Sequence, residues 1–450
     1  MATVSAPVTT GKTLQSAEIK EHLQRLRQTD NFTNWGYLLR TYLFLALVIA
    51  GCVAFDLWRQ AAGWHWTLSL PVFVLGILAV GAGQHQLSGL AHEGVHHILF
   101  RNRILNELVS DWFCLFPLFS STYHYRLQHL AHHQFVNDPE RDPDVSQLQT
   151  SGHWLSFPIT RQEFFSALGR QLLLLPLVRF ILVRAKYNAT GTDKNPYMKK
   201  GVKLSKTAVR IGIAYLFTLL GVLAWGVYTG EILWLGIVPG VLYAGVMTTF
   251  ALIPASSFHT SRLHPVISQR TMTLLRITYL SLVFGSLAWI THLTGVPAWL
   301  YYALLWLVPI FTSFSFFMIL RQWVQHGNGD RGWLTNTRVF FVDRLLNFAV
   351  FPMGQDYHLP HHMYATVPHY RLKELHELLL GCEEYRSQAI EVHGYFSSPE
   401  HPQLHPTVID VLGPKYAVKE KHETYFDHSV LDDCEVEEKD AILREGSAKG

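Results

Sequence analysis

The sequence predicts an all-α protein, a multi-pass transmembrane helical bundle of four to six spans with a cytosolic helical cap that carries clustered histidines. Three observations support this fold class. Hydrophobic residues make up 49% of the 450 residues and charged residues 16%, against roughly 25% charged in an ordinary soluble chain. Several apolar runs approach the ~20 residues that a helix needs to cross a bilayer. Nine of the 25 histidines gather in three polar segments just beyond these runs.

The apolar runs define the expected spans in chain order. The first two are expected at about 41–58 and 68–90, and four more follow at about 208–229, 231–255, 272–294 and 298–320. Two shorter apolar stretches, 106–119 and 171–183, are interrupted by Asp111 in the first and by Arg179 in the second. We expect them to lie at the membrane surface as short helices rather than to cross it.

The composition divides the chain into three parts. Residues 1–35 are expected to form a polar cytoplasmic N-terminal arm, residues 36–390 the membrane domain, and residues 391–450 a charged, loosely ordered C-terminal tail. The four cysteines are far apart and form no CxxC motif, so neither a disulfide framework nor a cysteine zinc site is expected. A net charge of +3 without a basic stripe argues against a nucleic-acid partner.

Lysines and arginines gather at one end of the expected spans, and such residues favour the cytoplasmic side of a membrane. The residues concerned are Arg25, Arg27, Arg40, Arg101, Arg103, Lys199, Lys200, Lys203 and Lys206. An even number of spans separates these groups along the chain. We therefore expect an integral protein of the lipid bilayer whose histidine-rich segments all lie on the cytoplasmic face.

Three polar segments carry the clustered histidines. They read HEGVHH, HLAHH and HLPHH, and their histidines are His92, His96, His97, His129, His132, His133, His358, His361 and His362. Residues three and four apart share one face of a helix, so we expect each cluster to direct its imidazoles to one point. Imidazole is a good ligand for Zn, Cu, Fe and Ni. Eight or nine imidazoles are too many for one ion and suit two ions side by side.

Two other interpretations compete for these motifs. HEGVHH alone matches the HExxH motif of a zinc protease, in which Glu93 would be the general base. A histidine-rich metal transporter would place its histidines along a path inside the spans. The protease leaves both HxxHH clusters unexplained, and the histidines here stand at the ends of the spans, apart from His85 and His292.

The order HxxxH, HxxHH, hydrophobic block, HxxHH resembles the membrane fatty acid desaturase superfamily, a group of histidine-box di-iron enzymes. The resemblance includes the flanks AHEGVHHILF, HYRLQHLAHHQFVNDPERDPD and DYHLPHHMYATVPHYRLKELHELL and spans about residues 35–385. It implies one further ligand, which the segment LRQWVQHG supplies. The metal ligands implied by the resemblance are His92, His96, His129, His132, His133, His326, His358, His361 and His362.

The sequence departs from the family pattern at some positions. His97 is an alternative to His96, because some members space the first pair one residue wider. Gln322 stands where some members place an amide that holds an iron-bound water, and we predict that role for it. Pro360 indicates that a helix begins near His361. Acidic residues are expected to support the ligand rings from outside, and they are Glu93, Asp138, Asp142, Asp144 and Asp356.

The resemblance implies an oxidoreductase that acts on paired donors with reduction of O2. The favoured activity is a fatty acyl or lipid desaturase that introduces a C=C double bond, using two Fe ions, O2 and electrons from an external donor of the ferredoxin or cytochrome b5 type. No HPGG haem motif occurs, so a separate electron-transfer protein is expected. The runner-up is a lipid, alkane or carotenoid hydroxylase or ketolase of the same superfamily. A membrane zinc metalloprotease is the remote alternative.

Overall fold

A computed structural model describes residues 13–190, 195–199, 201, 205–418, 428–432 and 434–442. Among these residues, six helical segments are long and apolar enough to cross a membrane, which confirms the predicted helical membrane bundle. They are Thr33–Ala61 (α2), Trp66–Val95 (ending in α3, Ser69–Val95), Thr207–Thr229 (α9), Leu233–Leu252 (ending in α10, Val238–Leu252), Gln269–Thr294 (α11) and Ala298–His326 (α12, Ala298–Tyr302; α13, Val308–Phe311; α14, Ser313–His326).

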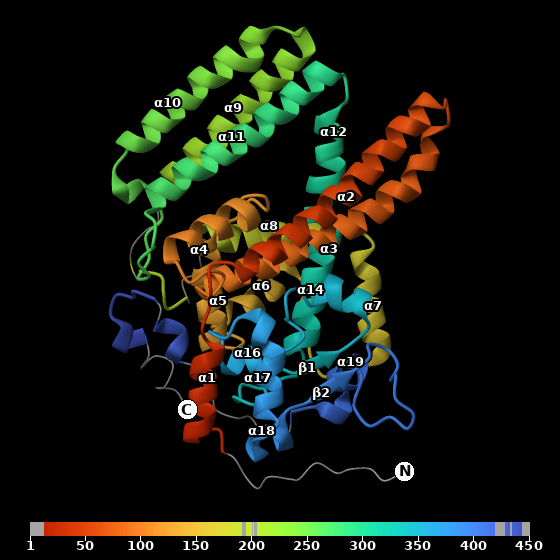
Figure 1. The fold of residues 1–450 in the computed structure, drawn as a ribbon, viewed down its shortest axis with the longest axis vertical. Coiled ribbons are helices and arrows are strands. Elements are labelled where there is room, and N and C mark those ends of the chain that lie inside the picture. Colours follow the sequence, from red (N-terminus) through yellow and green to blue (C-terminus); the bar gives the residue numbers. More distant parts are fainter. Residues whose placement is uncertain are drawn as a thin grey trace.

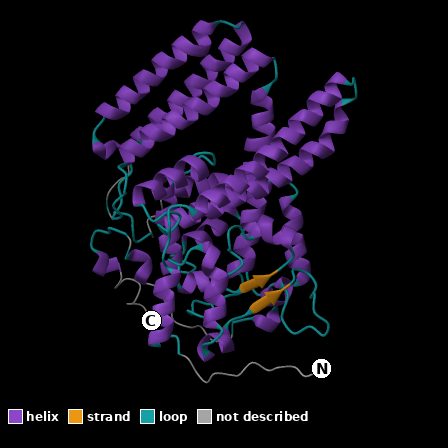
Figure 2. Cartoon of the chain, in the orientation of Figure 1, coloured by secondary structure: helices purple, strands orange, loops and turns teal. Residues whose placement is uncertain are grey.

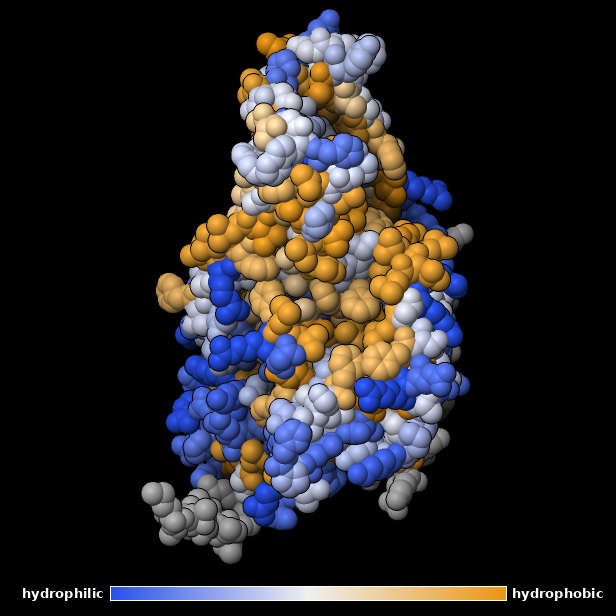
Figure 3. Space-filling model, turned by 90° about the vertical axis from the view of Figure 1, so that its right-hand side faces the viewer, coloured by the Kyte–Doolittle hydropathy of each residue, from blue (hydrophilic) through white to orange (hydrophobic). Residues whose placement is uncertain are grey.

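The long helices leave apolar side chains on their outer surfaces. Helices α9, α10 and α11 lie side by side, and α2 and α3 form a separate pair (Figure 1). Between α9, α10 and α11, Leu223, Phe250 and Phe284 are buried together, whereas Phe217 and Val241 are exposed. Figure 3 shows apolar surface over the middle of one face and hydrophilic surface around the cap below. Helices that are apolar on their outside as well suit hydrocarbon rather than water.

Helices α3 and α14 approach each other closely inside the bundle. A Cβ atom added to Gly81 would lie 2.1 Å from Ser313 Oγ and 2.7 Å from the backbone nitrogen of Phe314, so only glycine fits there. Ser313 Oγ also donates a hydrogen bond to the carbonyl of Ile77 at 2.6 Å. The polar end of α3 carries His92 and that of α14 carries His326, so this contact helps to set the distance between those ends.

The polar end of the molecule is a cap of short helices with two short strands (Figure 2). Its strands, β1 (Val339–Phe341) and β2 (Glu391–His393), pair in parallel. The helices of the cap and of its border with the bundle are α1 (Ala17–Leu26), α4 (Arg103–Val109), α5 (Thr122–Gln134), α6 (Pro143–Ser151), α7 (Arg161–Gln171), α8 (Leu175–Thr190), α15 (Arg344–Val350), α16 (His358–Met363), α17 (Leu372–Leu379), α18 (Glu383–Gln388) and α19 (Val408–Leu412).

The two stretches expected at the membrane surface form short helices. Residues 106–119 contain the end of α4 and a π-helical turn, Ser110–Leu115. Residues 171–183 fall at the junction of α7 and α8, where the chain bends by 82°. Helices α7 and α8 reach the length of a span only as this bent pair, so the described residues hold six such segments, or seven if the pair is included.

Part of the predicted C-terminal tail is packed rather than loosely ordered. The chain from 391 to 412 supplies β2 and α19, and Val392, Val408 and Leu412 are fully buried. Pairing with β1 holds β2, and a capping box at Thr407 begins α19. The composition of the tail could not predict these few apolar contacts, because the tail is rich in proline and charged residues. The division of the chain into three domains stays a prediction.

Candidate metal centre

Nine histidines meet in the cap, at the polar ends of α3 and α14. They form two groups, and within each group the ligand nitrogens lie within 4.8 Å of one another. The five-histidine group consists of His92, His96, His129, His133 and His361, and the four-histidine group consists of His132, His326, His358 and His362. The structure thus brings together all nine positions that the sequence resemblance implied.

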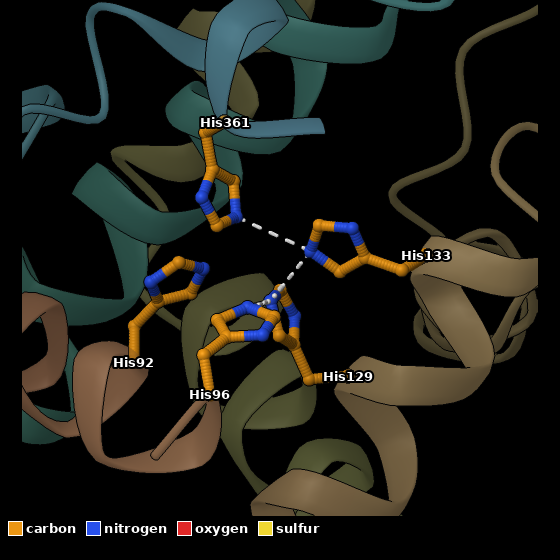
Figure 4. A group of neighbouring side chains, drawn as sticks. All are labelled: His92, His96, His129, His133 and His361. Atoms are coloured by element: carbon orange, nitrogen blue, oxygen red, sulfur yellow. Dashed lines mark hydrogen bonds between the residues drawn. The ribbon is translucent and has the colours of Figure 1, made fainter. Parts of the chain in front are cut away.

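In the five-histidine group, the rings converge from three elements on one small volume (Figure 4). The Nε2 atom of His129 lies 2.9 Å from that of His96 and 3.0 Å from that of His133, which in turn lies 3.2 Å from His361 Nε2. His92 Nε2 is buried and has no hydrogen-bond partner. Five imidazoles therefore point inward with little else between them.

The four-histidine group has the same construction. His358 Nε2 lies 2.9 Å from His326 Nε2 and 3.1 Å from His362 Nε2. The ring of His132 completes the group at 4.8 Å from that of His326. The two groups are neighbours, because the rings of His133 and His362 stack at 4.3 Å. The arrangement is that of two adjacent sites rather than one.

The histidine clusters of the sequence are divided between the two groups, which corrects the expectation that each cluster serves one point. On α5, His129 and His133 turn to the five-histidine group and His132 turns to the four-histidine group. On α16, His358 and His362 face one group and His361 the other. Residues four apart nearly share a helix face, whereas adjacent residues differ by about 100°. An HxxHH motif is therefore suited to two neighbouring ions.

The donor set fits two transition-metal ions. A neutral imidazole has only one N–H, so a chain of close Nε2 contacts such as that from His96 through His129 and His133 to His361 does not satisfy its members by hydrogen bonding alone. Nitrogen atoms bound at about 2.1 Å to one ion, at about a right angle, lie about 3 Å apart. The observed spacing is the same. Buried imidazoles free of carboxylate ligands suit Fe, Zn, Cu or Ni rather than Mg or Ca.

A buried polar network holds the end of α3, where the first histidine cluster lies. Arg126 on α5 donates to the carbonyls of Gly94 and Val95 at 2.7 Å each, and its guanidinium is paired with Glu107 at 2.5 Å. Burial alone would raise the pKa of Glu107, but Arg126 outweighs it and lowers that pKa to about 2. The network holds the chain where α3 ends. Val95 is the last residue of the helix, and His96 follows it as the C-cap.

The same network separates His96 from His97. His97 has a left-handed backbone with φ of 58°, and its Nδ1 lies 3.4 Å from Glu107. Burial and the charge of Arg126 lower the pKa of His97 to about 4. His97 thus belongs to the Glu107–Arg126 network, whereas His96 belongs to the five-histidine group. The geometry favours His96 in the choice that the sequence left open.

Hydrogen-bond acceptors outside the four-histidine group orient two of its rings. His132 Nδ1 lies 3.0 and 3.1 Å from the two oxygens of Asp142, and His326 Nδ1 lies 3.3 Å from the carbonyl of Asn336. Burial opposes a charge on His132, but the Asp142 carboxylate outweighs burial and raises the pKa of that ring to about 9. Because the Nδ1–H is held by the acceptor, an ion that displaces the Nε2 proton finds the ring already oriented, and the acceptor makes the ring a stronger ligand.

Of the other acidic residues expected to support the rings, Glu93 and Asp144 lie near histidines and Asp138 does not. Glu93 is buried, with one oxygen 3.4 Å from His92 Nδ1 and the other accepting from the backbone N–H of His369 at 2.8 Å. Asp144 is farther off, 3.9 Å from His132 Nδ1. Asp138 instead pairs with Arg141 and Arg331, so it supports a loop rather than a ring.

The sequence suggested a role near the metal centre for three further residues, which are Gln322, Asp356 and His85. Gln322 is buried one turn before His326 on α14, and its Oε1 has no hydrogen-bond partner, so its predicted role in holding water stays open. Asp356 accepts a hydrogen bond from Asn347 at 2.9 Å instead of one from a histidine. His85 lies within 2.8 Å of the carbonyl of Ala349 and belongs to neither group.

The sequence did not single out Glu107, Arg126, Asn336 or Gln355. Gln355 places its side-chain amide 3.3 Å from His92 Nδ1, across a separation of 263 residues. The charge of Glu107 within the short apolar stretch 106–119 was the one available signal. No local pattern marks a backbone carbonyl as a partner of a ring, so Asn336 was not identifiable from sequence.

Replacing Asp142 by asparagine is expected to weaken metal binding by the four-histidine group by roughly 10- to 100-fold, because the amide no longer fixes the His132 ring as an anionic acceptor does. The rate at which a chelator removes the bound metal measures this. Asp138→Asn is the matched control, since Asp138 lies in the same loop and contacts arginines instead of a ring. Equal metal loss in the two variants would contradict the role of Asp142.

A cavity of about 620 Å³ lies beside the histidine groups, between α2, α3, α15 and the loop at His369. Tyr37, Phe348 and Tyr370 contribute aromatic walls, and Arg40 and Arg344 add two exposed positive charges. His369, which also lines the cavity, contacts Glu93 next to His92. The cavity therefore combines apolar walls, cations and proximity to the metal centre.

Comparison with known proteins gives the family. The family model described as fatty acid desaturase matches residues 64–287 and 238–392, which include all nine histidines. The chain belongs to the fatty acid desaturase family. Two desaturases are similar to it. Dihydrorhizobitoxine desaturase of Bradyrhizobium elkanii is 24% identical over 429 residues, which is 93% of this chain and 92% of that protein. Delta(8)-fatty-acid desaturase of Euglena gracilis is 26% identical over 121 residues, 27% of this chain and 28% of that protein.

Proposed function

We propose that this desaturase family member introduces a C=C double bond into a fatty acyl or other lipid chain, with O2 as oxidant and two Fe ions held by the nine histidines. The observation that carries the proposal is the pair of adjacent, all-imidazole groups at the polar ends of membrane helices. The family supports iron over other ions that imidazole accepts. The zinc-protease alternative leaves the four-histidine group without a role.

The overall reaction is balanced with an external reductant. The substrate CH2–CH2 unit loses two hydrogen atoms and becomes CH=CH, while O2 takes up these two hydrogens, two electrons and two protons to give two molecules of water. The bound iron pair would activate O2 for attack on an unactivated C–H bond. The electrons would come from a separate ferredoxin or cytochrome b5 type protein.

The chain's own residues hold and shield this chemistry. The nine histidines would bind the ions, and Asp142 and Asn336 would fix two of the rings. Eight of the nine histidine side chains are buried and His326 is half-buried, so bulk water has little access to the rings. A water-poor site protects a reactive oxidant from side reactions. By the distribution of lysine and arginine, the site lies on the cytoplasmic face.

Product analysis tests the proposal. The purified protein would be supplied with iron, O2, a reduced electron donor and saturated acyl substrates, and the products would be examined by mass spectrometry. A product lighter by two hydrogens, absent without O2, is expected. A product heavier by one oxygen would instead assign the chain to the hydroxylases of the family. Peptide cleavage with no lipid product would return it to the proteases.

A second candidate is desaturation of dihydrorhizobitoxine or a chemically related compound. It is favoured by the similarity to dihydrorhizobitoxine desaturase, which extends over 93% of the chain, whereas the similarity to the delta(8)-fatty-acid desaturase covers 27%. Offering both substrate classes in the same assay distinguishes the candidates. The preferred substrate is the one with the higher kcat/KM.

We further propose that the cavity beside α2 and α15 admits the substrate and that Arg40 and Arg344 bind its anionic group. Replacing Arg344 by glutamine is then expected to raise KM roughly tenfold or more, because hydrogen bonds to charged groups contribute about 1.5–3 kcal/mol. The value of kcat should change little. Arg161→Gln, which removes an arginine outside the cavity, is the matched control. An unchanged KM would exclude this binding mode.

A further inference from the structure

A second cluster of metal-binding side chains lies at the end of β2, among residues that the sequence had assigned to a loose tail. The rings of His393 and His405 stack in parallel, with centroids 4.0 Å apart and planes at 13°. Glu400 stands at one edge of this pair of rings, and Glu391 stands at the other. All four side chains are partly exposed, between 20% and 37%, so the cluster lies near the surface of the cap.

Glu400 fixes the protons of both rings. Its Oε1 lies 3.0 Å from His393 Nδ1 and 2.9 Å from His405 Nδ1. Its Oε2 accepts hydrogen bonds from the backbone N–H groups of Leu404 and His405 at 3.2 and 3.0 Å. An ionised carboxylate only accepts, so each ring places its N–H at Nδ1. Both Nε2 lone pairs are therefore directed to the opposite edge of the stack.

Glu391 occupies that opposite edge. Its Oε2 lies 3.6 Å from His393 Nε2 and 3.9 Å from His405 Nε2. Its Oε1 is 3.2 Å from the Nε2 of His376, which holds the carboxylate in place. Two lone pairs and an anionic oxygen repel each other unless a cation lies between them. His393 Nε2 is moreover buried without a hydrogen-bond partner.

We propose that Glu391, His393 and His405 bind a divalent transition-metal ion, for which zinc is the best match, at a site near the surface of the cap and distinct from the nine-histidine centre. Two imidazoles and a carboxylate are a common zinc ligand set, with bonds of about 2.0–2.2 Å, and water supplies a fourth ligand. Ligand atoms on a tetrahedral ion lie about 3.4 Å apart, so the rings, whose Nε2 atoms are 3.6 and 3.9 Å from the Glu391 oxygen, would have to close by a few tenths of an ångström on the ion. Glu400 is the carboxylate that orients the two ligating rings.

The site would join strand β2 to the loop that follows it. Glu391 and His393 belong to β2, and His405 comes from the loop that leads to α19. The ion would close this loop on itself. Since β2 pairs with β1, the metal also stabilises the edge of the cap. The site does not depend on the proposed reaction, so its test and the test of desaturation are independent.

The experiment measures zinc and iron content of the full-length protein after equilibrium dialysis against micromolar Zn2+, by elemental mass spectrometry. Wild type is compared with His405→Asn, His393→Asn and the control His401→Asn, an exposed histidine of the same loop outside the cluster. We expect the first two variants to bind one zinc fewer than wild type and the control, with the same iron content in all four. Zinc should also raise the melting temperature of wild type and not that of His405→Asn.

Two results would overturn the proposal. One is equal zinc content in wild type and both cluster variants, which would place the ion elsewhere. The other is no zinc bound to wild type even at saturating Zn2+, which would leave the cluster as histidines and glutamates that share protons. His405 is 37% exposed, so its substitution tests the site even if the His393 variant does not fold.

Discussion

Replacing His96 by asparagine is expected to remove iron from the five-histidine group and to reduce product formation below detection. His96 Nε2 lies inside this group, 2.9 Å from His129 Nε2. The other four rings of the group occupy their own ligand positions, so none of them replaces the lost ligand. Iron content and product yield of the purified variant measure the effect. The iron content should fall by about half or more, depending on how strongly the two sites depend on each other.

His97→Asn is the matched control for this change. The two histidines are adjacent and buried, but His97 faces Glu107 and Arg126. Asparagine also tolerates the left-handed backbone at that position, where φ is 58°. This variant should keep both irons and most of the activity. The opposite pattern, with iron lost from His97→Asn and retained in His96→Asn, would show that the first ligand pair has the wider spacing.

Replacing Arg126 by methionine is expected to destabilise the protein by about 3–5 kcal/mol, since Glu107 is left buried without its partner. The change is also expected to abolish iron binding by the five-histidine group, to which His92 and His96 belong. The Arg126 side chain is 2% exposed and that of Glu107 is 6% exposed, so water does not compensate for the loss. The carbonyls of Gly94 and Val95 also lose their donor. Thermal unfolding and iron content of the detergent-purified variant report the two effects.

The double variant Arg126→Met, Glu107→Leu separates charge from position. Removal of both charges eliminates the unpaired carboxylate, so much of the stability should return. Iron binding should not return with it, because the helix end at Gly94 and Val95 still lacks its donor. If the double variant is as unstable as the single one, the ion pair is not the source of the effect.

The ion pair also predicts a pH dependence. The pKa of Glu107 is lowered from 4.5 to about 2 in the folded protein, so its contribution to stability is complete above about pH 4.5 and is lost as the pH falls toward 2. The difference in melting temperature between wild type and the double variant should therefore shrink over this interval. A constant difference would contradict the lowered pKa of Glu107.

The sequence by itself determined the membrane class of this protein and seven of the nine grouped histidines, while His326 came from the family resemblance and the choice between His96 and His97 stayed open. The apolar runs and the histidine spacings are local properties. A run of about twenty apolar residues is long enough to cross a bilayer as a helix wherever it occurs. Histidines at intervals of three and four residues share a helix face in any fold, so a motif such as that of His129 and His133 is recognisable without a structure.

The tertiary structure alone decided how these histidines are shared between two groups, which outer residues hold them and where the tail packs. His132 and His133 are neighbours in the chain and face different groups, because the position of α5 relative to α14 and α16 selects the group. Arg126 and Gln355 reach the first cluster across long stretches of chain. Such contacts depend on packing over the whole fold, and no short pattern of residues encodes them.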